Sequence, residues 1–223
     1  MTLDPIGTVH TCFGSKFAVP RQPGLCPSAW GILEFHEAYR SAEAIRGIEG
    51  FSHLWLIFGF HETAAQGWKP TVRPPRLGGN RRIGVFASRS TFRPNSLGLS
   101  LARLEAIEDG PRLLLGGVDL IDGTPVYDIK PYLPYAEALP NAAAGFASDE
   151  IPRLEVEIAG GALEVFQHLP ERSQAVIREA LALDPRPAVQ ADDADRTFGA
   201  LLCGHNVRFI IADDVCRIVE IGL

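Results

Sequence analysis

The chain has 223 residues, 46% of them hydrophobic and 22% charged, with 27 acidic residues, 21 basic residues and a formal net charge of −6. This composition excludes a disordered chain, and the length suits one large domain with a small appendage. The first residues lack the features of a signal peptide, and no apolar run is long enough for a membrane span, so we expect a cytoplasmic protein. The four cysteines are sparse and do not lie at ligand spacing from histidines, so we expect reduced thiols and no metal site.

The N-terminal part of the chain is expected to be mostly strands, because short β-branched and aromatic runs alternate with Gly and Pro. A short helix is expected at residues 39–46, where a polar, alanine-containing stretch stops at Gly47. Closure of the sheet would remove exposed edges, so the pattern predicts a mostly β fold with a single-sheeted antiparallel β-barrel over residues 1–140. The expected strands are residues 6–12, 30–35, 52–60, 82–87, 99–107, 112–120 and 126–129.

The C-terminal part is expected to form a small α+β domain over residues 163–223. An Ala-, Pro- and Asn-containing linker, which follows Tyr135 and runs to about Ser148, and a strand at residues 154–159 precede it. Residues 171–183 have the apolar spacing of an amphipathic helix, stopped by the turn Asp184-Pro185-Arg186-Pro187. Two expected strands, residues 207–212 and 215–221, flank Asp213-Asp214, a two-residue polar connection that is typical of a hairpin.

The densest group of polar side chains lies in residues 84–98, where an apolar strand runs into a loop carrying Arg89, Arg93 and Asn95. Two guanidinium groups and an amide can hold a carboxylate or a phosphate. This loop belongs to residues 63–104, which contain eight basic residues and no acidic one. Such a block in an acidic protein indicates a docking site for a polyanion, unless acidic residues from elsewhere in the fold balance it.

Three aspartates, Asp119, Asp122 and Asp128, lie at the ends of apolar strands around a Gly-Thr-Pro turn. Carboxylates grouped in this way can bind a divalent metal, accept hydrogen bonds from a ribose or balance a cationic ligand. Asp-Gly is also a common turn dipeptide, so a purely structural role for Asp122 stays open.

Two further places could contact a ligand. The loop at residues 16–24 carries Arg21 and Gln22 between two prolines, which restrict its backbone. His61 and Glu62 directly follow an expected strand, so their side chains lie where a strand end can meet a ligand. No G-x-S-x-G, P-loop or G-x-G-x-x-G pattern occurs, which argues against hydrolase, nucleotide triphosphatase and Rossmann cofactor chemistry.

Five segments of the N-terminal part carry a recognisable set of motifs: residues 17–25, 46–55, 73–80, 84–98 and 122–132. In this order they resemble the signature of the TsaA-like, or TrmO, family of transfer RNA methyltransferases. The resemblance implies a single-sheeted β-barrel that works as a homodimer and holds S-adenosylmethionine near the subunit interface. The implied reaction is N6-methylation of threonylcarbamoyl-adenosine at position 37, just 3′ of the anticodon, in threonine transfer RNA.

The same resemblance, carried over position by position, implies a set of cofactor contacts. Arginines suit the amino-acid carboxylate of S-adenosylmethionine, and carboxylates suit its sulfonium and ribose, so the residue types agree with this role. Methyl transfer depends mainly on alignment, so no obligatory acid or base is expected, and Arg93, Asn95 and Asp128 are the catalytic candidates. The implied contacts are Pro20, Arg21, Gln22, His61, Glu62, Arg89, Leu99, Asp119, Leu120, Ile121 and Asp122.

Two positions depart from the family pattern: Glu62 stands where the pattern has glutamine, and Ser96-Leu97 replaces a Pro-Ile pair. Two other functions stay open at this point. One is a module that binds S-adenosylmethionine or RNA without turnover, and the other is a metal-dependent hydrolase built on the aspartates. The C-terminal domain is expected to help grip the anticodon arm of the transfer RNA.

Overall fold

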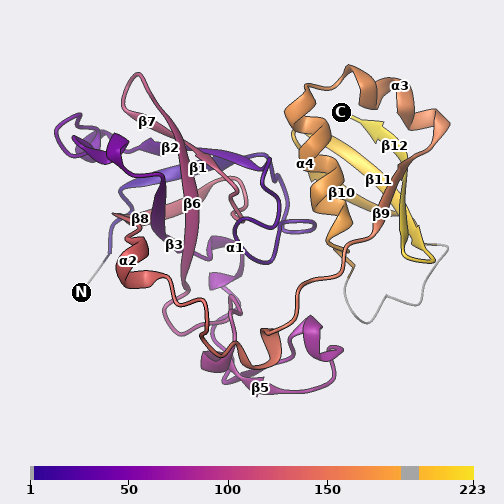
Figure 1. Cartoon of the computed structure of the whole chain (residues 1–223), viewed down its shortest axis with the longest axis horizontal. Coiled ribbons are helices and arrows are strands. Elements are labelled where there is room, and N and C mark those ends of the chain that lie inside the picture. The colour runs from indigo at the N-terminus through magenta and orange to yellow at the C-terminus, as the bar shows by residue number, and fades with distance from the viewer. Residues whose placement is uncertain (1–2, 187–195) are drawn as a thin grey trace.

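The computed structural model describes residues 3–186 and 196–223, which form a closed barrel followed by a four-stranded sheet with two helices (Figure 1). The predicted turn after residue 183 includes Pro187, which lies outside the described residues. No helix in the described ranges is long and apolar enough to cross a membrane. All four cysteines are free thiols.

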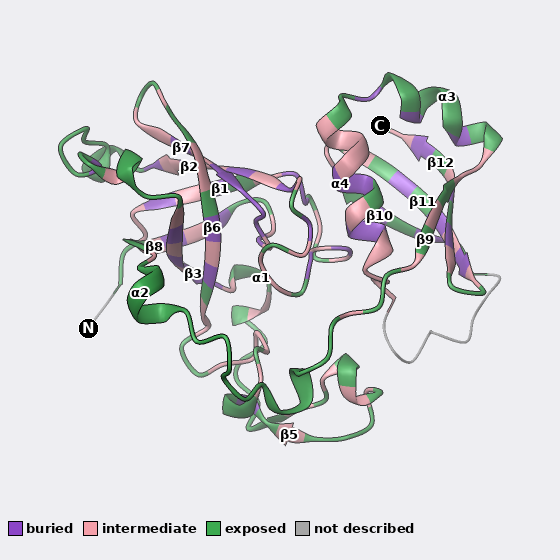
Figure 2. Cartoon of the chain, in the orientation of Figure 1, coloured by how far each residue is buried: buried purple, intermediate pink, exposed green. Residues whose placement is uncertain are grey.

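Six antiparallel strands close the barrel in the order β1-β2-β7-β6-β3-β8. Side chains alternate between the two faces of a strand, so Leu54 and Leu56 on β3, and Leu113 and Leu115 on β7, face the barrel interior, and all four are fully buried. Figure 2 shows buried stretches along the barrel strands. The predicted mostly β fold with a single-sheeted antiparallel barrel is confirmed. The strands are β1 (Gly7–Thr11), β2 (Trp30–Phe35), β3 (His53–Gly59), β6 (Leu97–Glu108), β7 (Arg112–Gly116) and β8 (Thr124–Pro131).

The helix predicted at residues 39–46 is wrong. Two short 3₁₀ helices, η1 (Glu37–Tyr39) and η2 (Ile48–Gly50), lie at its ends, and turns connect them. A stretch this short gains little from helix formation unless one face is buried, and Ile45 is its one buried side chain.

Two predicted strands are also shorter than expected. Residues 82–87 divide into β5 (Ile83–Gly84), which pairs with β4 (Thr71–Val72), and the 3₁₀ turn η4 (Val85–Ala87). Strand β7 stops at Gly116 because Gly117 has a left-handed backbone, with φ of 67°, which turns the chain away from the sheet.

The C-terminal unit is a sheet in the order β10-β11-β12-β9, covered by α3 and α4. Its predicted hairpin is confirmed: Ala212 pairs with Val215, and Asp213 and Asp214 both have positive φ, as a type I′ turn requires. Strand β9 pairs with β12, so this sheet begins before residue 163, the expected domain start. The elements are β9 (Glu155–Ile158), α3 (Gly160–His168), α4 (Glu171–Ala182), β10 (Phe198–Leu202), β11 (His205–Ala212) and β12 (Val215–Gly222).

The loop after β1 joins the barrel to the C-terminal sheet. Phe13 forms an isolated antiparallel bridge with Leu202 on the edge strand β10, and the amide of Cys203 donates to the Cys12 carbonyl at 2.7 Å. The ring of Phe17 stacks on Phe198, with ring centroids 6.1 Å apart. The barrel therefore covers an edge that would otherwise be open to pairing.

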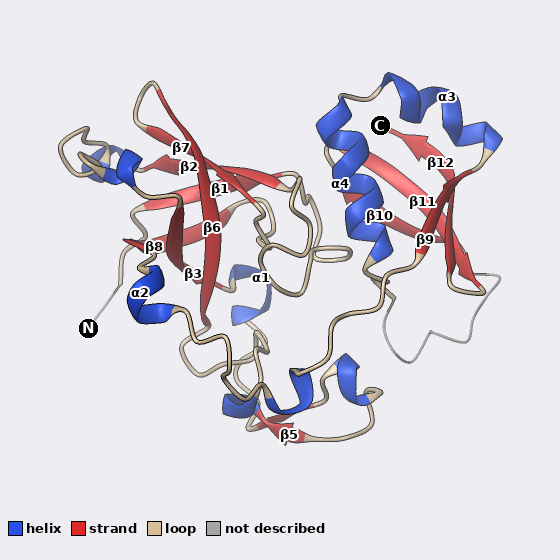
Figure 3. Cartoon of the chain, in the orientation of Figure 1, coloured by secondary structure: helices blue, strands red, loops and turns tan. Residues whose placement is uncertain are grey.

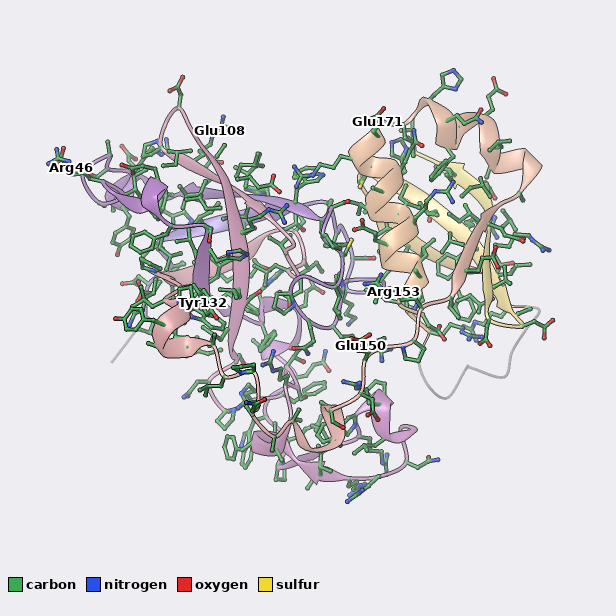
Figure 4. All side chains as sticks on the ribbon, in the orientation of Figure 1. Arg46, Glu108, Tyr132, Glu150, Arg153 and Glu171 are labelled. Atoms are coloured by element: carbon green, nitrogen blue, oxygen red, sulfur yellow. The ribbon has the colours of Figure 1, made fainter. Side chains whose placement is uncertain are left out.

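Helix α4 adds a polar contact between the two units. The Arg172 guanidinium donates two hydrogen bonds to the Glu105 carboxylate on β6, at 2.8 and 2.9 Å. Partial burial raises the pKa of Glu105, but hydrogen bonds from Arg172 and Arg103 outweigh it and hold the pKa below its ordinary value. Arg153, labelled in Figure 4 where the linker reaches the C-terminal unit, donates to the Leu25 carbonyl at 2.8 Å. Arg172 also donates to the Ser28 carbonyl at 2.9 Å, so Arg153 and Arg172 both hold the loop at residues 12–29 against the C-terminal unit.

Candidate active site

Three of the predicted cofactor residues come together from segments far apart in the sequence. Arg89 Nη1 donates a hydrogen bond to Gln22 Oε1. The positive charge of Arg89 also acts on the carboxylate of Asp119. We call Gln22, Arg89 and Asp119 the polar cluster.

Two glycines bring the loop of Gln22 close to the segment of Asp119. The amide of Gly24 donates to the Gly117 carbonyl at 2.9 Å, and a Cβ atom on Gly117 would lie 3.5 Å from the Cα of Gly24. The left-handed backbone of Gly117 favours glycine at this position. Backbone geometry therefore sets the approach of Gln22 to Asp119.

Asp119 is the most perturbed carboxyl group of the site. Burial raises its pKa from 3.8 to about 6, against the opposing effects of a hydrogen bond from Ser100 Oγ and the charge of Arg89. At neutral pH this group is an anion that lacks much of its hydration, so a cationic or hydroxyl-bearing ligand would stabilise it. Ser100 was missed in the sequence, although a serine at an inward-facing position of an apolar strand is a usable signal.

Arg93, a catalytic candidate, forms hydrogen bonds within its own loop. Its Nη1 donates to the carbonyls of Ser88 at 2.9 Å and Val85 at 3.3 Å, across the turn that precedes Arg89. Its guanidinium also lies over the ring of Phe86, 5.7 Å from the centroid. Arg93 therefore holds the turn that positions Arg89.

We expect Arg93→Ala to lower the affinity for S-adenosylmethionine about tenfold, because one or two hydrogen bonds that orient the Arg89 loop are lost. Titration calorimetry of the purified variant measures this. Arg46→Ala is the control, since Arg46 is an exposed residue bonded to the equally exposed Glu43. Equal affinities in the two variants would show that Arg93 does not position the loop.

The turn that contains Asp122 is tied to the barrel. The amide of Thr11 donates to Asp122 Oδ1 at 3.0 Å, and His10 Nδ1 lies 3.3 Å from the same oxygen. Thr11 Oγ1 donates to the carbonyl of Leu120 at 2.9 Å, and the Leu120 side chain is buried. Ile121 contributes its carbonyl to a hydrogen bond from Thr124. Asp122 therefore has the structural role that the sequence left open, because its carboxylate ties the turn to β1.

His61 and Glu62 form the first turn of α1 (His61–Ala64), with His61 Nε2 3.9 Å from Glu62 Oε1. The amide of Phe60 donates to the Ser96 carbonyl at 2.8 Å, so α1 lies beside the start of β6. Ser96 has a φ of 50°, which proline cannot adopt, so the loop conformation seen here is closed to the Pro-Ile pair of the family pattern.

Four predicted site residues are exposed and make no hydrogen bond to the polar cluster within the described part of the chain. Asp128 lies opposite Ile57 in the pairing of β8 with β3, and its carboxylate accepts a hydrogen bond from the amide of Ile129 at 2.9 Å. In residues 3–186 and 196–223, no hydrogen bond joins Asp128, Asn95, Arg21 or Leu99 to the cluster, and all four are exposed. Pro20 is buried in its loop.

Comparison with known proteins identifies the class of this chain. A family model described as the tRNA-methyltransferase O N-terminal domain matches residues 8–138, and one described as the TrmO C-terminal domain matches residues 152–222. The chain therefore belongs to the TrmO family of tRNA methyltransferases, and the resemblance seen in its motifs is confirmed.

Individual relatives match over nearly the whole chain. The tRNA (adenine(37)-N6)-methyltransferase of Escherichia coli (strain K12) is 48% identical over 220 residues, which cover 94% of this chain and 93% of the relative. A Pseudomonas aeruginosa relative named RcsF is 44% identical over 226 residues, which cover 99% of this chain and 97% of the relative. A crystal structure of TrmO from Pseudomonas aeruginosa superposes with a TM-score of 0.83 at 38% identity, covering 100% of this chain and 98% of that one.

Proposed function

We propose that this protein transfers a methyl group from S-adenosylmethionine to N6 of the adenine at position 37 of transfer RNA. Family membership supports the enzyme class, and the name of the Escherichia coli relative describes this modification. The name of the Pseudomonas aeruginosa relative proposes an S-adenosylmethionine-dependent methyltransferase. The single observation that carries the cofactor assignment is the partly buried carboxylate of Asp119, which the charge of Arg89 influences while Arg89 bonds to Gln22.

The polar cluster fits the chemistry of this cofactor. When bound, S-adenosylmethionine supplies an electrophilic methyl group on a cationic sulfur. An ionised Asp119 can balance a positive charge or accept hydrogen bonds from the ribose, and the Arg89–Gln22 pair can receive the amino-acid carboxylate. The role of the protein is then to bind, orient and partly desolvate the reactants. The other implied contacts, from Pro20, Arg21, His61, Glu62, Leu99 and residues 120–122, complete this proposal.

Asn95 and Asp128 remain candidates to contact the reacting amine. Both are exposed, and Asn95 follows the loop that Arg93 holds. An amide or carboxylate oxygen can accept a hydrogen bond from N6 and orient its lone pair toward the methyl group. Arg93 is proposed as a positioning residue.

We further propose that the substrate is threonylcarbamoyl-adenosine in threonine transfer RNA. The threonyl group adds a carboxylate to the base. Arg21 is exposed, precedes Gln22 of the polar cluster, and forms no ion pair within the described ranges. An exposed guanidinium next to the cofactor cluster suits recognition of this carboxylate.

The proposed assembly is a cytoplasmic homodimer. Leu99, an implied cofactor contact, is 57% exposed on β6, and the neighbouring Trp55 and Leu101 are partly exposed. A second copy of the chain that covers this apolar strand face would complete the site around Leu99.

Incubation of the protein with methyl-labelled S-adenosylmethionine and transfer RNA tests the reaction. We expect label in RNA that carries threonylcarbamoyl-adenosine, a methylated form of that nucleoside by mass spectrometry, and little label in an unmodified transcript. Absence of label at saturating reagents would favour a binding module without turnover. Loss of activity with a chelator would instead revive the metal-dependent alternative.

A further inference from the structure

We propose that residues 63–95, here called the basic arm, form the surface that holds the RNA backbone, and that Phe86 on this arm stacks on an RNA base. This inference rests on the proposed function. It assigns the main RNA contact to the arm and not to the C-terminal unit.

The charge distribution separates the two regions. The basic arm carries seven basic residues and no acidic residue. Residues 152–222 carry seven basic and twelve acidic residues. An RNA backbone is a dense row of negative charge, so the arm attracts it and the C-terminal unit repels it.

The pairing of the arginines strengthens this contrast. Arg73, Arg81 and Arg82 on the arm are exposed, and none has an ion pair within residues 3–186 and 196–223. In the C-terminal unit, by contrast, Arg208 bonds to Glu220 at 2.9 Å and Arg217 to Glu157 at 2.9 Å. The arm therefore offers guanidinium charge that the fold does not already neutralise.

The arm is braced, so its charges are held in place. Within it, β4 pairs with β5, and Arg76 donates hydrogen bonds to the carbonyls of Ala147 and Asp149 on the linker. Figure 3 shows the arm and this linker together at the lower edge of the molecule, away from the C-terminal sheet. A preorganised surface loses less entropy when it binds.

Phe86 gives the arm a second kind of contact. Its side chain is 73% exposed on the turn η4, three residues before Arg89 of the polar cluster. Trp68, also on the arm, is 54% exposed. Proteins recognise unpaired RNA bases by stacking them on aromatic rings, often beside arginines. A base stacked on Phe86 would lie next to the proposed cofactor site.

The test measures binding of a fluorescent anticodon-arm RNA to the full-length protein across a range of salt concentrations. We expect the variant Arg73→Ala, Arg81→Ala, Arg82→Ala to bind at least about tenfold more weakly and to lower the salt slope by about one per lost phosphate contact. The matched control is Arg46→Ala, Arg208→Ala, Arg217→Ala, which removes the same charge from exposed sites outside the arm. It should change affinity less than about twofold.

Equal weakening in the two triple variants would overturn the basic arm as the RNA surface. If the wild type methylates RNA and the arm variant binds as tightly as the wild type, this inference fails and the proposed function stands. If the wild type does not bind RNA, both fail.

Phe86→Ala provides an independent readout. We expect kcat/KM for RNA to fall about tenfold or more, with unchanged affinity for S-adenosylmethionine, and Phe86→Tyr to restore most of it because the stacking face is kept. Sedimentation of the Phe86→Ala variant checks its assembly. If the Phe86→Ala variant no longer self-associates but each active site keeps a normal kcat/KM for RNA, Phe86 serves assembly and the stacking role is overturned.

Discussion

Asp119→Asn should make the free protein more stable at neutral pH and at the same time remove most of its affinity for S-adenosylmethionine. Asparagine keeps an oxygen that can accept the hydrogen bond from Ser100 but carries no charge that burial would penalise. The same change removes the anion that would balance the bound cofactor, so we expect the affinity for S-adenosylmethionine to fall about a hundredfold or more. Unfolding in urea and cofactor titration measure the two effects.

The stability effect depends on pH in a defined direction. Burial raises the pKa of Asp119 in the folded state to about 6, above its ordinary value of 3.8. The protonated form is therefore favoured by folding, and this contribution is lost as the pH rises from 3.8 through about 6. Above this window Asp119→Asn should gain roughly 2–3 kcal/mol of unfolding free energy, and at about pH 3 the gain should vanish.

Asp128→Asn is the matched control for stability. Asp128 is an exposed carboxylate on β8, so its substitution should shift the unfolding free energy by less than about 0.5 kcal/mol. An Asp119→Asn variant that is less stable than wild type at neutral pH would show that the carboxylate is already balanced in the free protein.

Phe13→Ala should cause the largest loss of stability, about 3–5 kcal/mol of unfolding free energy. Phe13 is 0% exposed and lies between the barrel and the C-terminal sheet, where it bridges to Leu202. Its removal leaves a cavity at this junction, so the two units should lose cooperativity as well as stability. Calorimetry should then resolve two transitions where the wild type has one.

Phe146→Ala controls for the loss of an aromatic ring, since Phe146 is 38% exposed on the linker. It should cost about 1 kcal/mol or less. A single transition and a similarly small loss for Phe13→Ala would mean that the units are coupled mainly by polar contacts such as Arg172 with Glu105.

Local patterns in the sequence determined much of the fold. Alternating apolar residues predicted β2 at its observed bounds, and apolar spacing predicted α4 to within one residue. The Asp213-Asp214 connection predicted a hairpin because these residues tolerate positive φ. The family signature, carried by short motifs in order, also identified the enzyme class.

Other features depended on contacts between distant residues. The expected helix at residues 39–46 and strand at 82–87 had suitable local composition. Without a packing partner for one face, the first forms turns and the second forms only the two-residue strand β5 and a 3₁₀ turn. In the site, the sequence named Gln22, Arg89 and Asp119, whereas the docking of Gly24 on Gly117 decided that they meet. It also named Arg93 but could not assign it to the carbonyls of Val85 and Ser88.

The physical reason is the range of the interactions. Periodicity and turn chemistry act over a few residues, so the sequence by itself determined the strands, the hairpin and the types of side chain available for chemistry. The raised pKa of Asp119 comes from burial, and its hydrogen bond comes from Ser100 on β6. Closure of the barrel brings such residues together through long-range pairing, which only the tertiary structure decides.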